Sequence, residues 1–275
     1  MVTPINSSLG KKHSLNQGDE LRRAIVRKPG MNFSSGLTTS DLDTPDLNTT
    51  LQQHLSYCRA LETCGLQLTV LDADMDFPDG TFVEDTAILT KEVAILTRPG
   101  APSRQGEVIL IQPILAESFD YLEQIASPGC VEGGDICDVS GHFFIGISQR
   151  TNENGASQLS TILQRYGFTS STIDIRGIPG VLHLKSGLAW LGDDTIVVDE
   201  RLKDQPGFSR YRKLVLSIKE AYAANCIRIK QHVLIAKGFP SLESLLLDEN
   251  YSIVQLDVSE FRKMDGGLSC LSLRY

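Results

Sequence analysis

Short apolar runs that occur in pairs dominate the pattern along this chain of 275 residues. The two runs of each pair are separated by a small polar turn ("TKE", "SGH", "GDD" or "KQ"), which is typical of a β-hairpin. One further apolar run lies near each end of the chain. The pattern predicts hairpins over 81–89 with 93–97, 131–139 with 143–147, 182–191 with 195–198 and 225–229 with 233–236, and single strands over 24–26 and 267–273.

The two unpaired strands are expected to pair with each other. The segment "AIVRKPG" at 24–30 resembles "AILTRPG" at 94–100, and both have the pattern of the second strand of a hairpin that ends in a Pro-Gly turn. The first strand therefore lacks a partner before it, and the last strand lacks a partner after it. Pairing the two ends of the chain removes an exposed sheet edge and closes a ring.

Helical periodicity between the hairpins completes a repeating unit. Apolar residues recur at steps of three and four over 47–64, 108–125, 157–166, 211–221 and 242–247, with Pro113 expected to kink the second helix. Hairpin, helix and extra strand recur five times, which predicts a five-bladed α/β propeller: a single domain over residues 1–275, with 1–20 as a flexible N-terminal segment. A two-domain α/β protein is the alternative, and the similarity of the terminal strands argues against it. The polar segment 32–44 is either a functional lid or disordered.

Charge and cysteine content narrow the class of ligand and the compartment. A net charge of −8 and a pI near 5.2 argue against a surface for nucleic acid or anionic membrane and favour a small cationic ligand. No apolar run is long enough for a signal-peptide core or a membrane span, so a cytoplasmic protein is expected. The six cysteines have neither close pairing nor C-x-x-C spacing, which indicates thiols and no structural metal site.

Polar residues interrupt the first strand of every hairpin near its start. A strand buried on both faces normally reads as a continuous apolar run, and in a ring of inward-facing hairpins these positions converge on the axis. Each alone has a structural interpretation, since a single His or Cys in an apolar strand is more often a core residue. Together they indicate a polar axial site. The residues are Glu84, Asp85, Glu132, Asp135, His183, Asn225 and Cys270.

These side chains have the chemistry of a cysteine nucleophile that acts on a cation. A cysteine attacks as the thiolate, and a nearby imidazolium such as His183 lowers its pKa and later moves protons. Glu132 can hold the imidazole in one tautomer. The remaining carboxylates make the axis negative, and a planar guanidinium matches carboxylates in bidentate fashion. Arg98 and Arg150, expected at the rim, can then bind a carboxylate at the other end of the substrate.

Five segments together resemble dimethylarginine dimethylaminohydrolase, a family of guanidine-modifying enzymes with the five-bladed propeller fold. They occur in order and with compatible spacing between about residue 21 and residue 275, and the combination of "VED", "TRPGAPSR", "GGD" and "LHLKS" within them is specific. The segments are "GTFVEDTAILTKEVAILTRPGAPSRQGEV", "VEGGDICDVSGHFFIGISQRTNENGA", "LHLKSGLAWLGDDTIV", "AANCIRI" and "MDGGLSCLSLRY".

The resemblance implies a role for each matching position. The implied catalytic residues are Cys270 as nucleophile, His183 as general acid and base, and Glu132 as orienting acid, where animal relatives tend to have Asp. Asp79 and Asp85 match positions that bind the amino and guanidino ends of the substrate. The full set of implied substrate-binding residues is Asp79, Glu84, Asp85, Arg98, Arg150, Asp265 and the lid residue Leu37.

The implied reaction is hydrolysis of Nω-methylated arginine to citrulline and dimethylamine or methylamine through a covalent thiouronium on Cys270. It requires no metal and no organic cofactor, and the partner is a small methylated arginine bound by a monomer or homodimer. Arginine deiminase and agmatine deiminase are alternatives, although the first carries a helical insertion and agmatine has no carboxylate for Arg98 and Arg150. A non-catalytic propeller that binds the ribosome is a third alternative, and it predicts no Cys-His-acid set at the axis.

Overall fold

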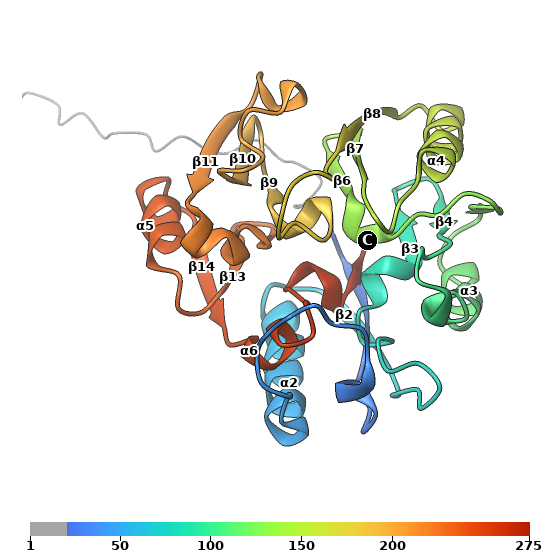
Figure 1. The fold of residues 1–275 in the computed structure, drawn as a ribbon, viewed down its shortest axis with the longest axis horizontal. Helices are drawn as coiled ribbons and strands as arrows, with labels where there is room; N and C mark the ends of the chain where they lie inside the picture. Colours follow the sequence, from blue (N-terminus) through green and yellow to red (C-terminus); the bar gives the residue numbers. More distant parts are fainter. Residues whose placement is uncertain (1–20) are drawn as a thin grey trace, which may run out of the picture.

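Five small sheets surround a common axis in the computed structural model, which describes residues 21–275 (Figure 1). Each sheet has three strands, and the sheets follow one another around the ring in chain order. This arrangement confirms the predicted five-bladed α/β propeller. The N-terminal segment 1–20, predicted to be flexible, lies outside the described residues.

All five blades share one plan. An inner strand runs antiparallel to the middle strand, and an outer strand runs parallel to the middle strand, so a crossover connects the last two. In the order inner, middle, outer, the blades are β15 (Leu273–Arg274), β1 (Arg23–Arg27) and β2 (Gln67–Leu71); β3 (Ala87–Leu89), β4 (Ala94–Leu96) and β5 (Leu122–Gln124); β6 (Ile136–Val139), β7 (His142–Ile147) and β8 (Thr169–Asp174); β9 (Leu188–Gly192), β10 (Thr195–Asp199) and β11 (Arg212–Leu216); and β12 (Ile227–Ile229), β13 (His232–Ala236) and β14 (Ser252–Leu256).

The two ends of the described chain close the ring. β1 pairs antiparallel with β15, with Ala24 opposite Arg274 and Ile25 opposite Leu273. The backbone N–H groups of Arg22 and Arg23 add hydrogen bonds to the carbonyl of Tyr275. The predicted pairing of the terminal strands is therefore confirmed, and the last residues of the chain are held at the axis by the first blade.

Helices cover the outside of four blades. They are α2 (Leu47–Thr63), α3 (Glu107–Ala116), α4 (Glu153–Arg165), α5 (Pro240–Asp248) and the short α6 (Ser259–Arg262). α2 and α4 begin after N-cap residues, where the side chains of Asp46 and Asn152 accept hydrogen bonds from backbone N–H groups of the first turn. None of the helices within residues 21–275 combines the length and the apolar character needed to cross a membrane.

Two helix predictions were wrong in type or extent. The segment predicted as one helix over 108–125 is helical only to Ala116, and its last part is strand β5. The helix predicted over 211–221 is strand β11 followed by a 3₁₀ segment. In β11 the buried Leu214 and Leu216 alternate with the exposed Val215, which is a strand period that a short apolar run does not distinguish from a helical one.

A 3₁₀ segment precedes the inner strand of every blade. The predicted inner strands, such as 81–89 and 131–139, are therefore too long at their N-terminal ends. Because such a tight turn presents successive side chains in different directions, neighbouring polar residues can face opposite ends of the axis. The 3₁₀ segments are η2 (Val83–Thr86), η4 (Gly133–Asp135), η5 (Leu184–Ser186), η7 (Ile218–Ala224) and η8 (Ser269–Leu271).

The apolar core is divided among the spaces between neighbouring blades. One cluster joins the first two blades through Ile25, Ala94 and Leu273, and four further clusters join the other neighbouring pairs around the ring. Burial of these side chains supplies most of the stabilisation. Since the apolar side chains pack between blades, the axis itself is left for polar groups.

Candidate active site

A cavity opens at the end of the axis where the 3₁₀ segments lie. Asp85, Glu132, His183 and Cys270 line it, each from the start of a different inner strand, and the segment around Leu37 covers its side. The structure therefore brings together the proposed nucleophile, the imidazole and two acidic residues from positions that span most of the chain. They lie on 3₁₀ turns or at their N-caps, which corrects the prediction that they lie within strands.

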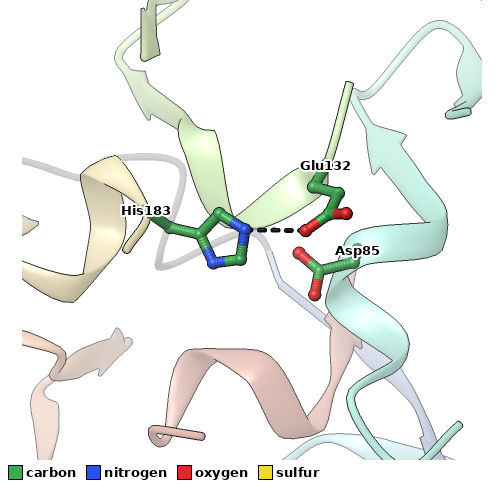
Figure 2. Close-up of side chains that lie close together, drawn as sticks. All are labelled: Asp85, Glu132 and His183. Atoms are coloured by element: carbon green, nitrogen blue, oxygen red, sulfur yellow. Dashed lines mark hydrogen bonds and ion pairs between the residues drawn. The ribbon is translucent and has the colours of Figure 1, made fainter. Parts of the chain in front are cut away.

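His183 and Glu132 form a buried ion pair at the centre of the site (Figure 2). His183 Nε2 lies 2.8 Å from Glu132 Oε2, and the other carboxylate oxygen accepts N–H groups from Gly100 at 3.0 Å and Ala101 at 3.3 Å. Glu132 is fully buried. With both oxygens engaged, this carboxylate fixes the orientation of the imidazole ring, as a Cys-His-acid arrangement requires.

The electrostatic surroundings keep this pair in its charged form. Burial lowers the pKa of His183, but the negative charges of Asp135, Asp85 and Glu132 outweigh it and raise the pKa to about 9. Burial raises the pKa of Glu132, but the hydrogen bond from His183 together with the positive charges of His183 and Arg104 lowers it overall. At neutral pH the site therefore holds an imidazolium beside a carboxylate.

Asp85 is held by a buried arginine that the sequence reasoning missed. Arg104 Nη1 lies 2.6 Å from Asp85 Oδ2, and Arg104 also binds Glu107 at 2.8 Å. Burial raises the pKa of Asp85, but Arg104, His183 and the N–H of Gly134 together lower it to about 2. The sequence did contain a clue to this arginine. Arg104 follows "GAPS" and Glu107 comes three residues later, and such a spacing allows the carboxylate partner that a buried arginine requires.

Asp85, Glu132 and His183 also have the spacing of a cation site. Their ligand atoms all lie within 4.8 Å of one another (Figure 2). However, Glu132 and His183 bind each other and Asp85 binds Arg104, so these donors already have partners. The arrangement fits proton transfer and cation recognition by carboxylates better than coordination of a metal ion.

Cys270 is a half-buried thiol on η8 that faces this cavity. The N–H of Gly267 donates to its Sγ at 3.4 Å. Burial, followed by the negative charges of Glu84 and Asp85, raises the pKa of Cys270 to about 12. At neutral pH the sulfur is therefore a neutral thiol, because burial and the carboxylates outweigh any lowering of its pKa by a nearby imidazolium.

The polar segment 32–44, for which the sequence left a lid or disorder as alternatives, lies against the cavity. The N–H of Leu37 donates to both oxygens of Asp79, at 3.0 and 3.2 Å, and Thr39 Oγ1 donates to Asp265 at 3.0 Å. Leu37, Asp79 and Asp265 thus line the cavity as expected. The carboxylates hold the segment in place over the site, which favours the lid interpretation of this loop.

Two residues predicted to bind substrate lie elsewhere. Arg98 points its guanidinium to the carbonyl of Gly129 and the sulfur of Cys130, at 3.3 and 3.1 Å, and does not line the cavity, whereas Arg150 does. Glu84 faces the opposite side of η2 and lines a different cavity. The sequence could not separate Glu84 from Asp85, because adjacent residues on a 3₁₀ turn diverge.

The walls of the cavity also include residues that the sequence reasoning did not identify. Apolar side chains from three segments contribute, and no periodic pattern marks them because they lie in loops. The additional lining residues are Thr38, Thr39, Phe82, Arg104, Leu182, Met264 and Gly266.

Comparison with known proteins agrees with this site. The family model described as arginine deiminase matches residues 73–214. The N(G),N(G)-dimethylarginine dimethylaminohydrolase of Pseudomonas aeruginosa is 40% identical over 255 residues, which cover 92% of this chain and 99% of the relative. The chain belongs to the dimethylarginine dimethylaminohydrolase family.

Solved structures of this family superpose closely on the propeller. A cysteine-to-serine mutant of the Pseudomonas aeruginosa enzyme, complexed with citrulline, has a TM-score of 0.90 at 39% identity and covers 93% of this chain and 99% of its own. A dimethylarginine dimethylaminohydrolase with a histidine-to-glycine substitution, an adduct with S-methyl-L-thiocitrulline, also has a TM-score of 0.90 at 39% identity, with coverages of 93% and 100%. The dimethylarginine dimethylaminohydrolase fold thus extends over nearly the whole described chain.

Proposed function

We propose that this protein hydrolyses Nω-methylated arginines, asymmetric dimethylarginine and monomethylarginine, to citrulline and dimethylamine or methylamine. The observation that carries the proposal is the cavity in which a thiol, an imidazolium–carboxylate pair and further carboxylates converge. Relatives with at least 39% identity are named for this activity, and one was solved with citrulline. The enzyme class is a hydrolase that acts on the C–N bond of a linear amidine.

The charge of the cavity supports a cationic amino acid as substrate. With His183 protonated, the carboxylates outnumber the cations by one, and a methylated arginine with ionised amino, carboxyl and guanidino groups carries one net positive charge. Arg150 is the most accessible partner for its carboxylate, and Asp79 for its amino group. The charged groups that line the cavity are Asp79, Asp85, Glu132 and Asp265 against Arg104, Arg150 and His183.

Binding of the substrate would itself activate the nucleophile. A guanidinium placed beside Asp85 offsets part of the negative charge that raises the pKa of Cys270, so the thiol loses its proton to solvent more readily once the substrate is bound. The thiolate then attacks the guanidinium carbon. The protonated His183 donates its proton to the departing amine, and a covalent thiouronium remains on Cys270.

The second half of the reaction returns the site to its starting state. His183, now neutral, accepts a proton from a water molecule as the oxygen attacks the thiouronium carbon. Collapse of that adduct breaks the C–S bond and releases citrulline, while the proton of the added hydroxyl passes to the departing sulfur and restores the thiol of Cys270. Glu132 stabilises the imidazolium in both steps because it lies 2.8 Å from His183 Nε2. The site supplies charge and positioning, which suits a substrate that is already an electrophilic cation.

Deimination of unmodified arginine is the second candidate, because the matching family model is described as arginine deiminase. A methyl group changes binding by only about 1–3 kcal/mol in an apolar pocket, so both substrates need to be measured. The deciding assay incubates the protein with asymmetric dimethylarginine, monomethylarginine, arginine and agmatine and measures citrulline, carbamoylputrescine and the released amine separately. Dimethylamine release with the highest kcat/KM is expected. Preferential conversion of agmatine, or no conversion of any substrate, would refute the proposal.

We also propose that the enzyme works in the cytoplasm on a free small molecule, as a monomer or homodimer. All six cysteines are free thiols, which suits a reducing compartment. The net charge of −8 disfavours association with nucleic acid or an anionic membrane. Light scattering during size-exclusion chromatography would distinguish the monomer from the homodimer.

A further inference from the structure

A second cavity lies on the other side of the 3₁₀ turns, along the inner strands. We call it the far cavity; its walls come from the five inner strands β3, β6, β9, β12 and β15, and Glu84, Lys185, Asn225 and Ser269 lie where it meets the turns. Within the described chain, the far cavity and the active-site cavity share no lining residue. A thin layer of turn residues therefore separates the two cavities.

Three turns contribute neighbouring residues to both sides of this layer. On η2, Glu84 lines the far cavity and Asp85 lines the active site. On η8, Ser269 lines the far cavity and Cys270 lines the active site. On η5 and its N-cap, the corresponding residues are Lys185 and His183. A side chain that binds the far-cavity residue of a turn therefore acts within one or two positions of an active-site residue.

The far-cavity residues are joined by short hydrogen bonds. Glu84 Oε1 lies 2.6 Å from Lys185 Nζ, and Glu84 Oε2 accepts from Ser269 Oγ at 2.8 Å. Asn225 Nδ2 donates to the carbonyl of Lys185 at 2.9 Å and to Ser269 Oγ at 3.0 Å, and the N–H of Ser269 donates to Asn225 Oδ1 at 2.8 Å. Arg274 Nη1 binds the carbonyl of Ser269 at 3.1 Å. The backbone just before Cys270 is thus held by three separate partners.

We propose that Glu84 and Lys185 are positioning residues of the active site, which act on the Cys270 thiol from the far cavity. This proposal rests on the role of Cys270 as the nucleophile. The two residues pair with each other and carry opposite charges, so they have opposite effects on the ionisation of the Cys270 thiol. Glu84 holds Ser269 through a hydrogen bond and opposes thiolate formation, whereas Lys185 favours thiolate formation across the layer.

The electrostatic directions agree with this assignment. After burial, the largest contribution that raises the pKa of Cys270 is the charge of Glu84, followed by that of Asp85, while Lys185 lowers the pKa. Other charged or titratable groups lie near the sulfur or near Glu84, and all of them are retained in the variants proposed below. Arg274 Nη2 lies 3.3 Å from Glu84 Oε1 on the far-cavity side. The others line the active site or interact electrostatically with Cys270 from η7. They are Asp79, Arg104, Glu132, Arg150, His183, Tyr222 and Asp265.

The test is the rate at which iodoacetamide alkylates Cys270, measured by mass spectrometry of the peptide that contains it, from pH 7 to pH 10. Glu84→Gln should alkylate faster than wild type and Lys185→Met more slowly, each by roughly three- to tenfold at the same pH, since the thiolate is the reactive form. The double variant should return close to the wild-type rate. Lys91→Met and Glu92→Gln, two exposed residues of the β3–β4 turn, remove the same charges far from the axis and should leave the rate unchanged.

Opposite shifts are the result that a purely structural role cannot produce, because loosening of the turns would raise the rate in both variants. Equal shifts in the same direction, or no shift in either, would overturn the proposal. If circular dichroism shows that Glu84→Gln does not fold, Glu84→Asp can be used, which keeps the charge and should alkylate at the wild-type rate. Lys185→Met alone should still show slower alkylation than wild type. Alkylation needs no turnover, so a protein that alkylates as expected but converts no methylarginine would refute the proposed function and leave this inference standing.

Discussion

The active-site cavity and the far cavity are built from the same turns but treat charge differently. In the far cavity, Glu84 is paired with Lys185 at 2.6 Å and with Ser269 at 2.8 Å. In the active-site cavity the imidazolium of His183 faces several carboxylates, and the thiol of Cys270 is raised in pKa beside them. In the far cavity the charge of Glu84 is balanced by a partner, whereas the excess of carboxylates in the active-site cavity suits the binding of a cation.

The difference teaches that chemical function in this fold depends on which way a turn residue points. Cys270 and Cys137 are both thiols whose pKa is raised to about 12, yet Cys270 lines the same cavity as His183 and Glu132, while Cys137 lines the far cavity. Burial and a raised pKa are therefore not sufficient for a nucleophile. We expect the imidazolium in the same cavity and the access of substrate to decide which thiol is the nucleophile.

The largest effect is expected from removing the thiol on the active-site side. Cys270→Ser should lower kcat by several orders of magnitude, because a hydroxyl is far harder to ionise than a thiol and loss of the nucleophile removes the covalent step. Its circular dichroism spectrum should match that of wild type. Activity is measured as citrulline formed from asymmetric dimethylarginine.

The matched control is Cys137→Ser in the far cavity. This variant should remain active, since Cys137 has no contact with the active-site cavity. A haloacetamidine should correspondingly label Cys270 and leave Cys137 unlabelled. Equal losses of activity in Cys270→Ser and Cys137→Ser would contradict the conclusion that the two cavities differ in function.

Replacement of the imidazole should separate the two chemical steps. His183→Gly is expected to lose roughly 10²- to 10⁴-fold in turnover, the usual contribution of a general acid and base. With S-methyl-L-thiocitrulline, whose thiol leaving group needs little protonation, it should still form an adduct on Cys270 but fail to hydrolyse it. Mass spectrometry of the intact protein detects the trapped adduct.

The absence of an adduct in His183→Gly, with the thiol still reactive toward iodoacetamide, would contradict the assignment of His183 to the second step. His142→Gln provides a histidine control outside the cavity, where the ring binds the hydroxyls of Thr169 and Ser171. That variant should turn over substrate as wild type does.

The two candidate carboxylate-binding arginines should differ in effect. Arg150 lines the active-site cavity, so Arg150→Ala should lower kcat/KM for methylated arginine by about 2–5 kcal/mol, the scale for losing one partner of a desolvated charge pair. Agmatine, which has no carboxylate, should lose little. The measurement is a substrate titration of both compounds against wild type and variant.

Arg98→Ala is the matched comparison, because Arg98 binds Gly129 and Cys130 outside the cavity. Its effect on kcat/KM should be small and equal for the two substrates. A selective loss of methylated arginine in Arg98→Ala, with none in Arg150→Ala, would restore the sequence-based assignment over the structural one.

The smallest effect concerns stability against pH. The pKa of His183 is raised from 6.5 to about 9 in the folded protein, so its contribution is complete below pH 6.5 and is lost as the pH rises toward 9. Between about pH 6.5 and 8.5 the free energy of unfolding should fall by on the order of 2 kcal/mol through this group. Urea denaturation at several pH values measures it.

His183→Gln should remove most of that decline. Burial raises the pKa of Asp135 from 3.8 to about 6, so the loss of stability that this group causes as the pH rises is largely complete by about pH 6.5. Burial lowers the pKa of His54 to about 4, and the gain that this group causes as the pH rises is also largely complete near pH 6.5. The buried thiols act above about pH 8.5, so His183 dominates the window between these values. An unchanged slope in His183→Gln would mean that the ion pair with Glu132 does not hold the proton as proposed.

The sequence alone determined the repeat and therefore the fold. Paired apolar runs predicted the inner and middle strands, and the missing partners of the first and last strands predicted the closure that β1 and β15 make. These features are local, because hydrophobic period and turn chemistry depend on neighbours in the chain. The pattern failed for β11, where Leu214 and Leu216 belong to a short run in which strand and helix periods overlap.

The sequence also identified the polar positions at the axis, including Cys270, His183 and Glu132, because each interrupts an otherwise apolar run. It could not determine the direction of each side chain or its state of ionisation. Those depend on the 3₁₀ turns and on contacts between blades, which send Glu84 to the far cavity, turn Arg98 away and bury Arg104 against Asp85. Tertiary structure decides these points because a charge in a low-dielectric interior is controlled by partners that lie close in space but far away in the chain.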